Sequence, residues 1–285
     1  MMKKNVSLFG LVLVLMLSVS CTSTESTSEL KGKVIEKTVK MKYFSQVEAS
    51  GAVRVTIYQG SSNPRVVLKG NERGLNHTSM KVRSEKLNIE RKQNFVTGDD
   101  RVEVKVYCNK VTDLSSSAGA SIFTKAMNHD KVTLETSSGG SLTVNNVKCS
   151  YLDVSASSGA DLDLTNVNAA ERANFDLSSG ADVDVEKLVA PAETNIDASS
   201  GASFDAAVRV GNLKADASSG AGIDLEGKGT TGTFSASGGS NIDADELVLD
   251  NLTNEASGGS EIEARAKVFQ NDADRSSNIR VNKAN

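Results

Sequence analysis

The chain has 285 residues, a formal net charge of −4 and 38% hydrophobic residues, which allows one large domain or two small ones. It has no tryptophan and only four tyrosines, which disfavours a lectin that stacks sugars on aromatic rings. Charge is divided unevenly, because residues 31–110 contain 17 Lys and Arg against 8 Asp and Glu, whereas residues 111–285 contain 13 against 26. A basic segment is typical of nucleic-acid binding, but an exported protein, as the signal described next indicates, rarely meets nucleic acid. We therefore interpret the basic segment as a solvated face of a sheet.

Residues 1–20 have the features of a secretory signal peptide. Lys3 and Lys4 precede an apolar run from Val6 to Leu17, and small residues follow. The alternative, a transmembrane anchor, requires about 20 apolar residues, and this run is shorter. We therefore expect an exported protein.

Residues 21–30 are predicted to be a lipidated cysteine and a flexible tether. Cys21 follows small residues and resembles the lipobox cysteine of bacterial lipoproteins, although Leu17 lies one place further from it than in the usual pattern. The Ser/Thr-rich stretch after Cys21 has too little apolar content to pack. Cys21 is thus the predicted lipid-attachment site at the outer membrane or cell surface, and plain secretion is the alternative.

Residues 31–110 are predicted to form an N-terminal β segment. Alternating runs such as VRVTIYQG and RVEVKVY are typical of strands, and Asn63-Pro64 and residues 71–74 indicate turns. The segment lacks a clear copy of the repeat described next. It is either a separate β-domain or, as we favour, the irregular first coils that cap a solenoid.

Residues 111–285 are dominated by one motif that occurs eight times between Leu114 and Ala264. Its order is apolar, polar, small, Ser, any residue, Gly, small, polar, apolar, acidic, apolar, and successive glycines are 19 to 21 residues apart. A fixed period of this size predicts stacked units that bury their apolar faces against one another. The aligned glycines are Gly119, Gly139, Gly159, Gly180, Gly201, Gly220, Gly239 and Gly259.

The motif predicts two short strands with a tight corner between them. The third residue after each glycine is apolar in every copy, and the flanking residues alternate with period 2, as in strands. Glycine suits the corner because it adopts positive φ without a Cβ clash. A third short side should follow, closed by a loop such as residues 165–172 or 186–193. The prediction is an all-β, right-handed parallel β-helix (solenoid) with ~20-residue coils, eight of which would extend about 40 Å.

Cys108 and Cys149 are predicted to be free, buried thiols. Both precede a corner glycine by about ten residues, so they lie two coils, or roughly 10 Å, apart. Disulfide-bonded Cα atoms must approach within about 7 Å.

Several segments together resemble a known family. SQVEASGAVRVTIYQG, VVLKGNERGLNHTSMKVRSEKLNIERK and RVEVKVYCNKVTDLSSSAGASI are similar to the head GIN domain family of autotransporter adhesins, which is common among Bacteroidetes-type lipoproteins. The resemblance extends from about Tyr43 to Val281. It implies a right-handed β-helix and an adhesive role, and it implies no catalytic residues.

The fourth residue after the glycine is acidic in six copies and should form an outward line of carboxylates. Neighbouring carboxylates ~5 Å apart repel by about 0.9 kcal/mol even in bulk water. The line is either a hydrated face that prevents association or a linear site for divalent cations such as calcium, or for a basic partner. Its residues are Asp163, Asp184, Asp205, Asp224, Asp243 and Glu263, and a shorter row contains Asp176, Asp197 and Asp216.

The sequence offers little support for catalysis. The motif serine, two before each glycine, is expected to serve the turn, because a nucleophile needs a paired base and only His77 and His129 are present. A pectinase-like enzyme would use one distinctive carboxylate pair, whereas these pairs recur in successive coils. We expect a non-catalytic envelope lipoprotein without a cofactor that binds a glycan, matrix or envelope partner. A purely structural assembly role and self-association remain alternatives.

Overall fold

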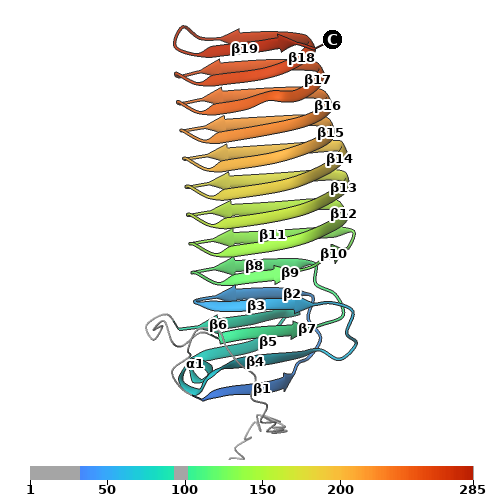
Figure 1. The fold of residues 1–285 in the computed structure, drawn as a ribbon, viewed down its shortest axis with the longest axis vertical. Coiled ribbons are helices and arrows are strands. Elements are labelled where there is room, and N and C mark those ends of the chain that lie inside the picture. The colour runs from blue at the N-terminus through green and yellow to red at the C-terminus, as the bar shows by residue number, and fades with distance from the viewer. Residues whose placement is uncertain (1–32, 93–101, 285) are drawn as a thin grey trace, which may run out of the picture.

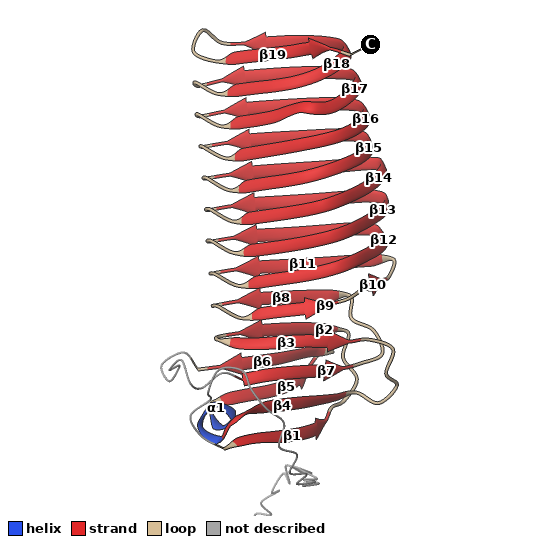
Figure 2. Ribbon diagram, viewed as in Figure 1, coloured by secondary structure: helices blue, strands red, loops and turns tan. Residues whose placement is uncertain are grey.

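The computed structural model describes residues 33–92 and 102–284, and the predicted signal peptide, Cys21 and tether lie outside them. The described chain forms a parallel β-solenoid of about nine turns, as predicted, with every strand in one sheet and one short helix. Figures 1 and 2 show the coils stacked along one axis, with the N-terminal strands at one end and β19 at the other. No described helix has both the length and the apolar character needed to cross a membrane.

Each central coil is one long strand that bends around the solenoid between two corners. The strands of the repeat are β8 (Asp113–Ser117), β9 (Ser121–Thr124), β10 (Met127–Asn128), β11 (Lys131–Ser137), β12 (Ser141–Ser157), β13 (Asp161–Ser178), β14 (Asp182–Ser199), β15 (Ser203–Ser218), β16 (Gly222–Ser237), β17 (Asn241–Ser257), β18 (Glu261–Ala273) and β19 (Asn278–Lys283). Consecutive coils pair in parallel and in register. We call the stretch before each corner the before-corner wall and the stretch after it the after-corner wall.

The prediction of closing loops at residues 165–172 and 186–193 is wrong. Strands β13 and β14 run through these segments, which remain paired with their neighbours. Register shifts between Val185 and Leu188, and between Ala190 and Glu193, absorb the bend. Bulges of this kind let a strand curve while most of its backbone hydrogen bonds persist.

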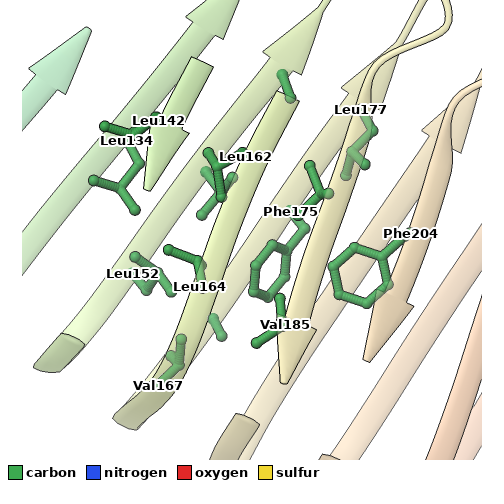
Figure 3. Packing of buried hydrophobic residues seen from close by; sticks show 14 of the residues in the cluster. Leu134, Leu142, Leu152, Leu162, Leu164, Val167, Phe175, Leu177, Val185 and Phe204 are labelled. Atoms are coloured by element: carbon green, nitrogen blue, oxygen red, sulfur yellow. The ribbon is translucent and has the colours of Figure 1, made fainter. Parts of the chain in front are cut away.

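The core consists of columns of equivalent side chains from successive coils (Figure 3). The third position after the glycine is nearly inaccessible in every coil, as Leu162, Val183 and Ile223 illustrate. Phe175 from the before-corner wall meets Phe204 from the after-corner wall, with ring centroids 4.9 Å apart. These contacts confirm that the apolar positions of the motif point inward and stack.

Each corner is a tight turn in which two consecutive residues have positive φ. At the first corner Ala118 has φ 53° and Gly119 has φ 79°, and the amide of Ala120 donates to the carbonyl of Ser117 at 3.0 Å. Two positive-φ central residues define a type I′ turn, the form that matches strand twist. The backbone carbonyl of the motif serine accepts the hydrogen bond that closes the corner. The serine hydroxyl does not take part in this bond.

The N-terminal segment forms an end cap of mixed strand direction. It contains β1 (Val34–Lys40), β2 (Gln46–Ser50), β3 (Val53–Tyr58), β4 (Arg65–Asn71), α1 (Glu72–Asn76), β5 (Thr78–Arg83), β6 (Lys86–Arg91) and β7 (Val102–Tyr107). The predicted turn at residues 71–74 is the start of α1, whose N-cap Asn71 accepts from the Gly74 amide at 2.7 Å. Strands β1, β4 and β5 pair antiparallel, so they end the parallel stack.

Two layers of the cap are themselves coils, in an order that differs from the chain order. Strands β2 and β3 lie between β6 and β7 on one side and β8 and β9 on the other. Gly51, with φ 75°, makes the corner between β2 and β3. The prediction that residues 31–110 lack a clear copy of the motif is therefore wrong, because VEASGAVRV is a copy with a corner of equal length, in which the glycine directly follows the serine.

Both remaining cysteines are free and buried, as predicted. Burial raises the pKa of the Cys108 thiol to about 12 and that of Cys149 to about 11. Both side chains therefore act as small apolar groups in the core.

Candidate functional site

The predicted line of carboxylates exists, and we call it the acidic column. Its members pair directly, coil on coil, along the after-corner wall, and they alternate with the buried core residues. Below it, the Thr143 hydroxyl donates to Asp163 at 3.3 Å. Above it, Arg280 of β19 donates to Glu263 at 2.5 Å. The acidic column consists of Asp163, Asp184, Asp205, Asp224, Asp243 and Glu263.

The position two residues earlier in each coil widens this acidic surface. Asp161 and Asp182 pair with each other beside Asp163 and Asp184, and Glu261 lies beside Glu263. Ser203, Gly222 and Asn241 occupy the same position in the intervening coils, so the flanking row is only partly charged. The after-corner wall thus presents one continuous line of carboxylates with a broken second line beside it.

Crowding of like charges perturbs the column electrostatically. The pKa of Asp224 is raised by partial desolvation and then by Asp243 and Asp205. The pKa of Asp205 is raised in the same direction by desolvation and by Asp182 and Asp184, although a hydrogen bond from Ser203 opposes the shift. The ionised carboxylates of this wall therefore repel one another, and this repulsion destabilises their charged form.

The shorter row lies on the before-corner wall and is partly neutralised. Asp176, Asp197 and Asp216 pair in register, and Lys214 forms an ion pair with Asp216. Desolvation and the two neighbouring aspartates raise the pKa of Asp197. Because Lys214 lies among these aspartates, the after-corner wall is the more strongly anionic of the two.

Three carboxylates near the C-terminal end lie close together. One oxygen of each of Asp243, Asp245 and Glu263 lies within 4.8 Å of the others. Asp245 also borders an open depression of about 610 Å³ that is shared with Glu246, Arg265, Asn282 and Lys283. Arg265 and Lys283 offset the negative charge there, so this end of the column is less purely anionic than its middle.

His129 lies apart from the acidic column. Its Nε2 is 3.3 Å from Gln59 Oε1, which also accepts from the Val111 amide at 2.9 Å. Burial and the charge of Lys110 lower the pKa of His129. This histidine ties the cap to the first coils.

Sequence reasoning missed an aromatic stack on the outer surface of the cap. Tyr58 and Tyr107 stack with centroids 5.0 Å apart, and the Arg65 guanidinium lies 4.0 Å from the Tyr107 centroid. These residues occupy equivalent outward positions on β3, β7 and β4. The pairing of β3 with β7 could not be inferred from adjacent sequence, because 43 residues separate the two strands.

The sequence profile of the family described as "Putative auto-transporter adhesin, head GIN domain" matches residues 43–191 and 165–277. A comparison with curated protein sequences finds no match.

Solved structures share the fold at low sequence identity. One similar structure is "a putative adhesin from Parabacteroides merdae ATCC 43184", with a TM-score of 0.60 and 13% identity over 90% of this chain and 98% of that one. Another is a "putative adhesin from Parabacteroides distasonis ATCC 8503", with a TM-score of 0.57 and 14% identity over 88% and 98%. The matches of the family profile together cover most of the chain, so this protein belongs to the head GIN domain family of auto-transporter adhesins.

Proposed function

We propose that this protein is a non-catalytic binding module of the cell envelope, an adhesin, that recognises a positively charged extracellular partner through its acidic column. The observation that carries the proposal is the unbroken in-register row of six carboxylates on an outward wall. The family description and the adhesins of similar fold support an adhesive role.

The chemistry of the wall favours a repetitive cationic ligand. Strands in a sheet are ~4.8 Å apart, so the column offers charges at a regular spacing to Lys or Arg side chains or to an amino-bearing glycan. Each exposed ion pair contributes only about 0.2–1 kcal/mol, but several aligned pairs can add up. Raised carboxylate pKa values also favour such a partner, because its positive charges relieve the repulsion within the column.

We also propose that the chain reaches the envelope through its N-terminal segment. The Lys-Lys and apolar pattern of residues 1–20 supports export, and Cys21 supports lipid anchoring at the outer membrane or cell surface. Metabolic labelling with a radioactive fatty acid tests the anchor, because Cys21→Ser should abolish incorporation of the label into the protein.

The binding proposal is tested with an array of extracellular matrix proteins and glycans. The probe is the chain from Thr22 onward, which retains every strand and the helix of the fold. We expect binding to cationic array members, and we expect the triple variant Asp184→Asn, Asp205→Asn and Asp224→Asn to weaken it at least tenfold. The matched control neutralises three exposed carboxylates elsewhere, in the variant Glu135→Gln, Glu171→Gln and Glu193→Gln.

The outcomes separate adhesion from its alternatives. Equal loss of binding in both variants would show that only overall charge matters, and absence of any binding would favour an assembly role. A reducing-sugar assay on uronic-acid polymers tests the pectinase-like alternative. That alternative requires the unmodified chain to release reducing sugars from the polymer. Calcium binding at Asp243, Asp245 and Glu263 is tested by melting the chain with millimolar calcium, because a bound ion raises the melting temperature.

A further inference from the structure

The strand β1 forms the end of the rod opposite to β19 (Figure 1), and it carries an unusual combination of side chains. Its only strand partner in the described chain is β4, so its other edge faces away from the coils. Val34 is 41% exposed and Ile35 is 37% exposed. Lys33, Lys37 and Lys40 are exposed beside them, and so is Glu36. Successive side chains of a strand point to opposite sides, so Lys33, Ile35 and Lys37 lie on one side of β1 and Val34 and Lys40 on the other. We call the three lysines together with Val34 and Ile35 the basal face.

The three lysines of the basal face outnumber Glu36, the one acidic residue of β1. None of the three forms an ion pair within the described residues, whereas Lys86, Lys131 and Lys214 elsewhere do. The surrounding cap is basic as well, with 15 Lys and Arg against 6 Asp and Glu in residues 33–92 and 102–110. The basal face is therefore an apolar edge within a field of net positive charge.

The acidic column lies too far away to cancel this field. Pairing runs from β1 through β4, β7, β3, β9 and β12 to β13, where Asp163 begins the column. Six strand spacings of ~4.8 Å correspond to about 29 Å. The Debye length at physiological ionic strength is about 8 Å. The basic end at β1 and the acidic column therefore act as separate charged surfaces of opposite sign.

We propose that the basal face docks on an anionic lipid surface and holds the rod upright on it. Exposed lysines attract acidic headgroups, and Val34 and Ile35 can enter the boundary between headgroups and acyl chains. The acidic coils are repelled by the same surface, which disfavours a rod that lies flat. The inference deepens the proposed placement at the envelope, because the predicted tether of residues 21–30 shortly precedes β1 in the sequence and a single weak anchor is strengthened by a basic patch.

The experiment measures partitioning of the chain from Thr22 onward, without any lipid, onto vesicles. Vesicles of phosphatidylglycerol with phosphatidylcholine should bind it, and vesicles of phosphatidylcholine alone should not. Each Lys near such a surface contributes about fivefold in partitioning. The variant Lys33→Gln, Lys37→Gln and Lys40→Gln should therefore lose about 100-fold. The control Lys148→Gln, Lys187→Gln and Lys228→Gln changes net charge equally on the coils and should lose less than threefold.

Orientation is read from tryptophan fluorescence, because the chain has no tryptophan of its own. Tryptophan in Ile35→Trp should shift to shorter wavelength on anionic vesicles. Tryptophan in Val268→Trp, at the exposed opposite end, should not shift. Shifts at both positions would overturn the upright orientation.

Three further results would overturn the inference. These are equal losses in the two lysine variants, equal binding to neutral vesicles, and binding of dextran sulfate in the absence of vesicle binding. The Asp184, Asp205 and Asp224 variant should bind vesicles as the unmodified chain does. Loss of binding to the cationic array members would therefore leave vesicle binding unchanged, and loss of vesicle binding would leave binding to the array unchanged.

Discussion

The residue in front of each corner glycine has a backbone conformation that L-amino acids rarely adopt. Its φ is 55° at Ser179 and 54° at Ser200, and it is also positive at the equivalent residues Ala118, Ser138, Ser158 and Ser219. The last two copies place Gly238 and Gly258 there. A left-handed conformation costs an L-residue about 1–2 kcal/mol. Six of the corners therefore carry a small strain that the final two avoid.

Replacement of Ser179 by glycine should stabilise the protein. Relief of the left-handed conformation exceeds the entropy cost of glycine, so we expect a gain of about 0.5–1 kcal/mol in the free energy of unfolding by urea. Gly180→Ala should lose about 1–2 kcal/mol through strain alone, since its Cβ would meet no atom within 4 Å. The control is Ser178→Gly, at the end of strand β13, which should destabilise. Equal losses for Ser178→Gly and Ser179→Gly would contradict the strain argument.

Replacement of Asp224 by asparagine should also stabilise the protein at neutral pH. The folded-state pKa of Asp224 is raised above 3.8, so the folded state binds protons more tightly than the unfolded state. Ionisation of this group therefore lowers stability as the pH rises through 3.8 and the higher folded-state value. We expect Asp224→Asn to gain about 0.5 kcal/mol at pH 7 in low salt.

That gain should shrink in 1 M salt and vanish below pH 3.8, where the carboxyl is protonated in both states. Thermal unfolding across pH and salt checks this expectation. A gain that persists at acid pH would mean that asparagine stabilises by a new hydrogen bond instead.

At the level of elements, the turn between β18 and β19, residues 274–277, differs from the corners of the other coils. Asp274 accepts from the Gly258 amide at 2.9 Å and from the Ser276 amide at 3.0 Å. These bonds and the nearby serine hydroxyls hold the pKa of Asp274 well below its usual value. The segment 274–277 thus occupies corner amides of the coil below, which in other coils bond to the next corner.

Asp274→Ala should loosen the final coil. Amide hydrogen exchange at Gly258 and along β19 should accelerate, while exchange in β13 and β14 stays unchanged. Because the folded-state pKa is lowered, the stabilisation by Asp274 is present above pH 3.8 and is lost as the pH falls through the folded-state value. The control Asp272→Ala removes a neighbouring exposed carboxylate that pairs with Glu255 and should leave exchange unchanged. Faster exchange in both variants would contradict a specific capping role.

At the level of the whole molecule, the fold is a one-dimensional stack in which coils contact their neighbours. The extensive pairings join consecutive strands from β12 to β18. Such repeat proteins gain stability by a sum of unit and interface terms. One complete coil should therefore be removable without loss of the architecture.

Deletion of residues 160–180 joins Gly159 to Ala181 and removes 21 residues, one full coil. We expect a folded chain with one cooperative unfolding transition and a lower urea m-value, because less surface is exposed on unfolding. The register of the acidic column is retained, since Thr143 then precedes Asp184 in the stack. The control deletes residues 160–169, which moves core residues out of their columns and should abolish folding. A cooperative transition in the half-coil deletion would refute the register argument.

The repeat predicted the coils well because each unit carries its own short-range information. The third position after the glycine, Leu162 in one copy, points inward, and the fourth, Asp163 in that copy, points outward. Alternation alone therefore predicted both the core and the acidic column. The same reasoning failed at residues 165–172, where polar residues suggested a loop although the strand continues through a bend. It also missed Gly51, because this glycine follows its serine directly, whereas one residue separates them in the eight copies.

By itself, the sequence determined the coil length, the strand class, the inward columns and the row of carboxylates, because strand alternation and the corner glycine act over a few residues. Only the tertiary structure decided that β2 and β3 lie between the layers of β6 and β7 and of β8 and β9. It also decided that Tyr58 stacks on Tyr107 and that Val34 and Ile35 form the exposed base of the rod. Those outcomes depend on which distant strand edges pair to bury the common core, and no local pattern contains that choice.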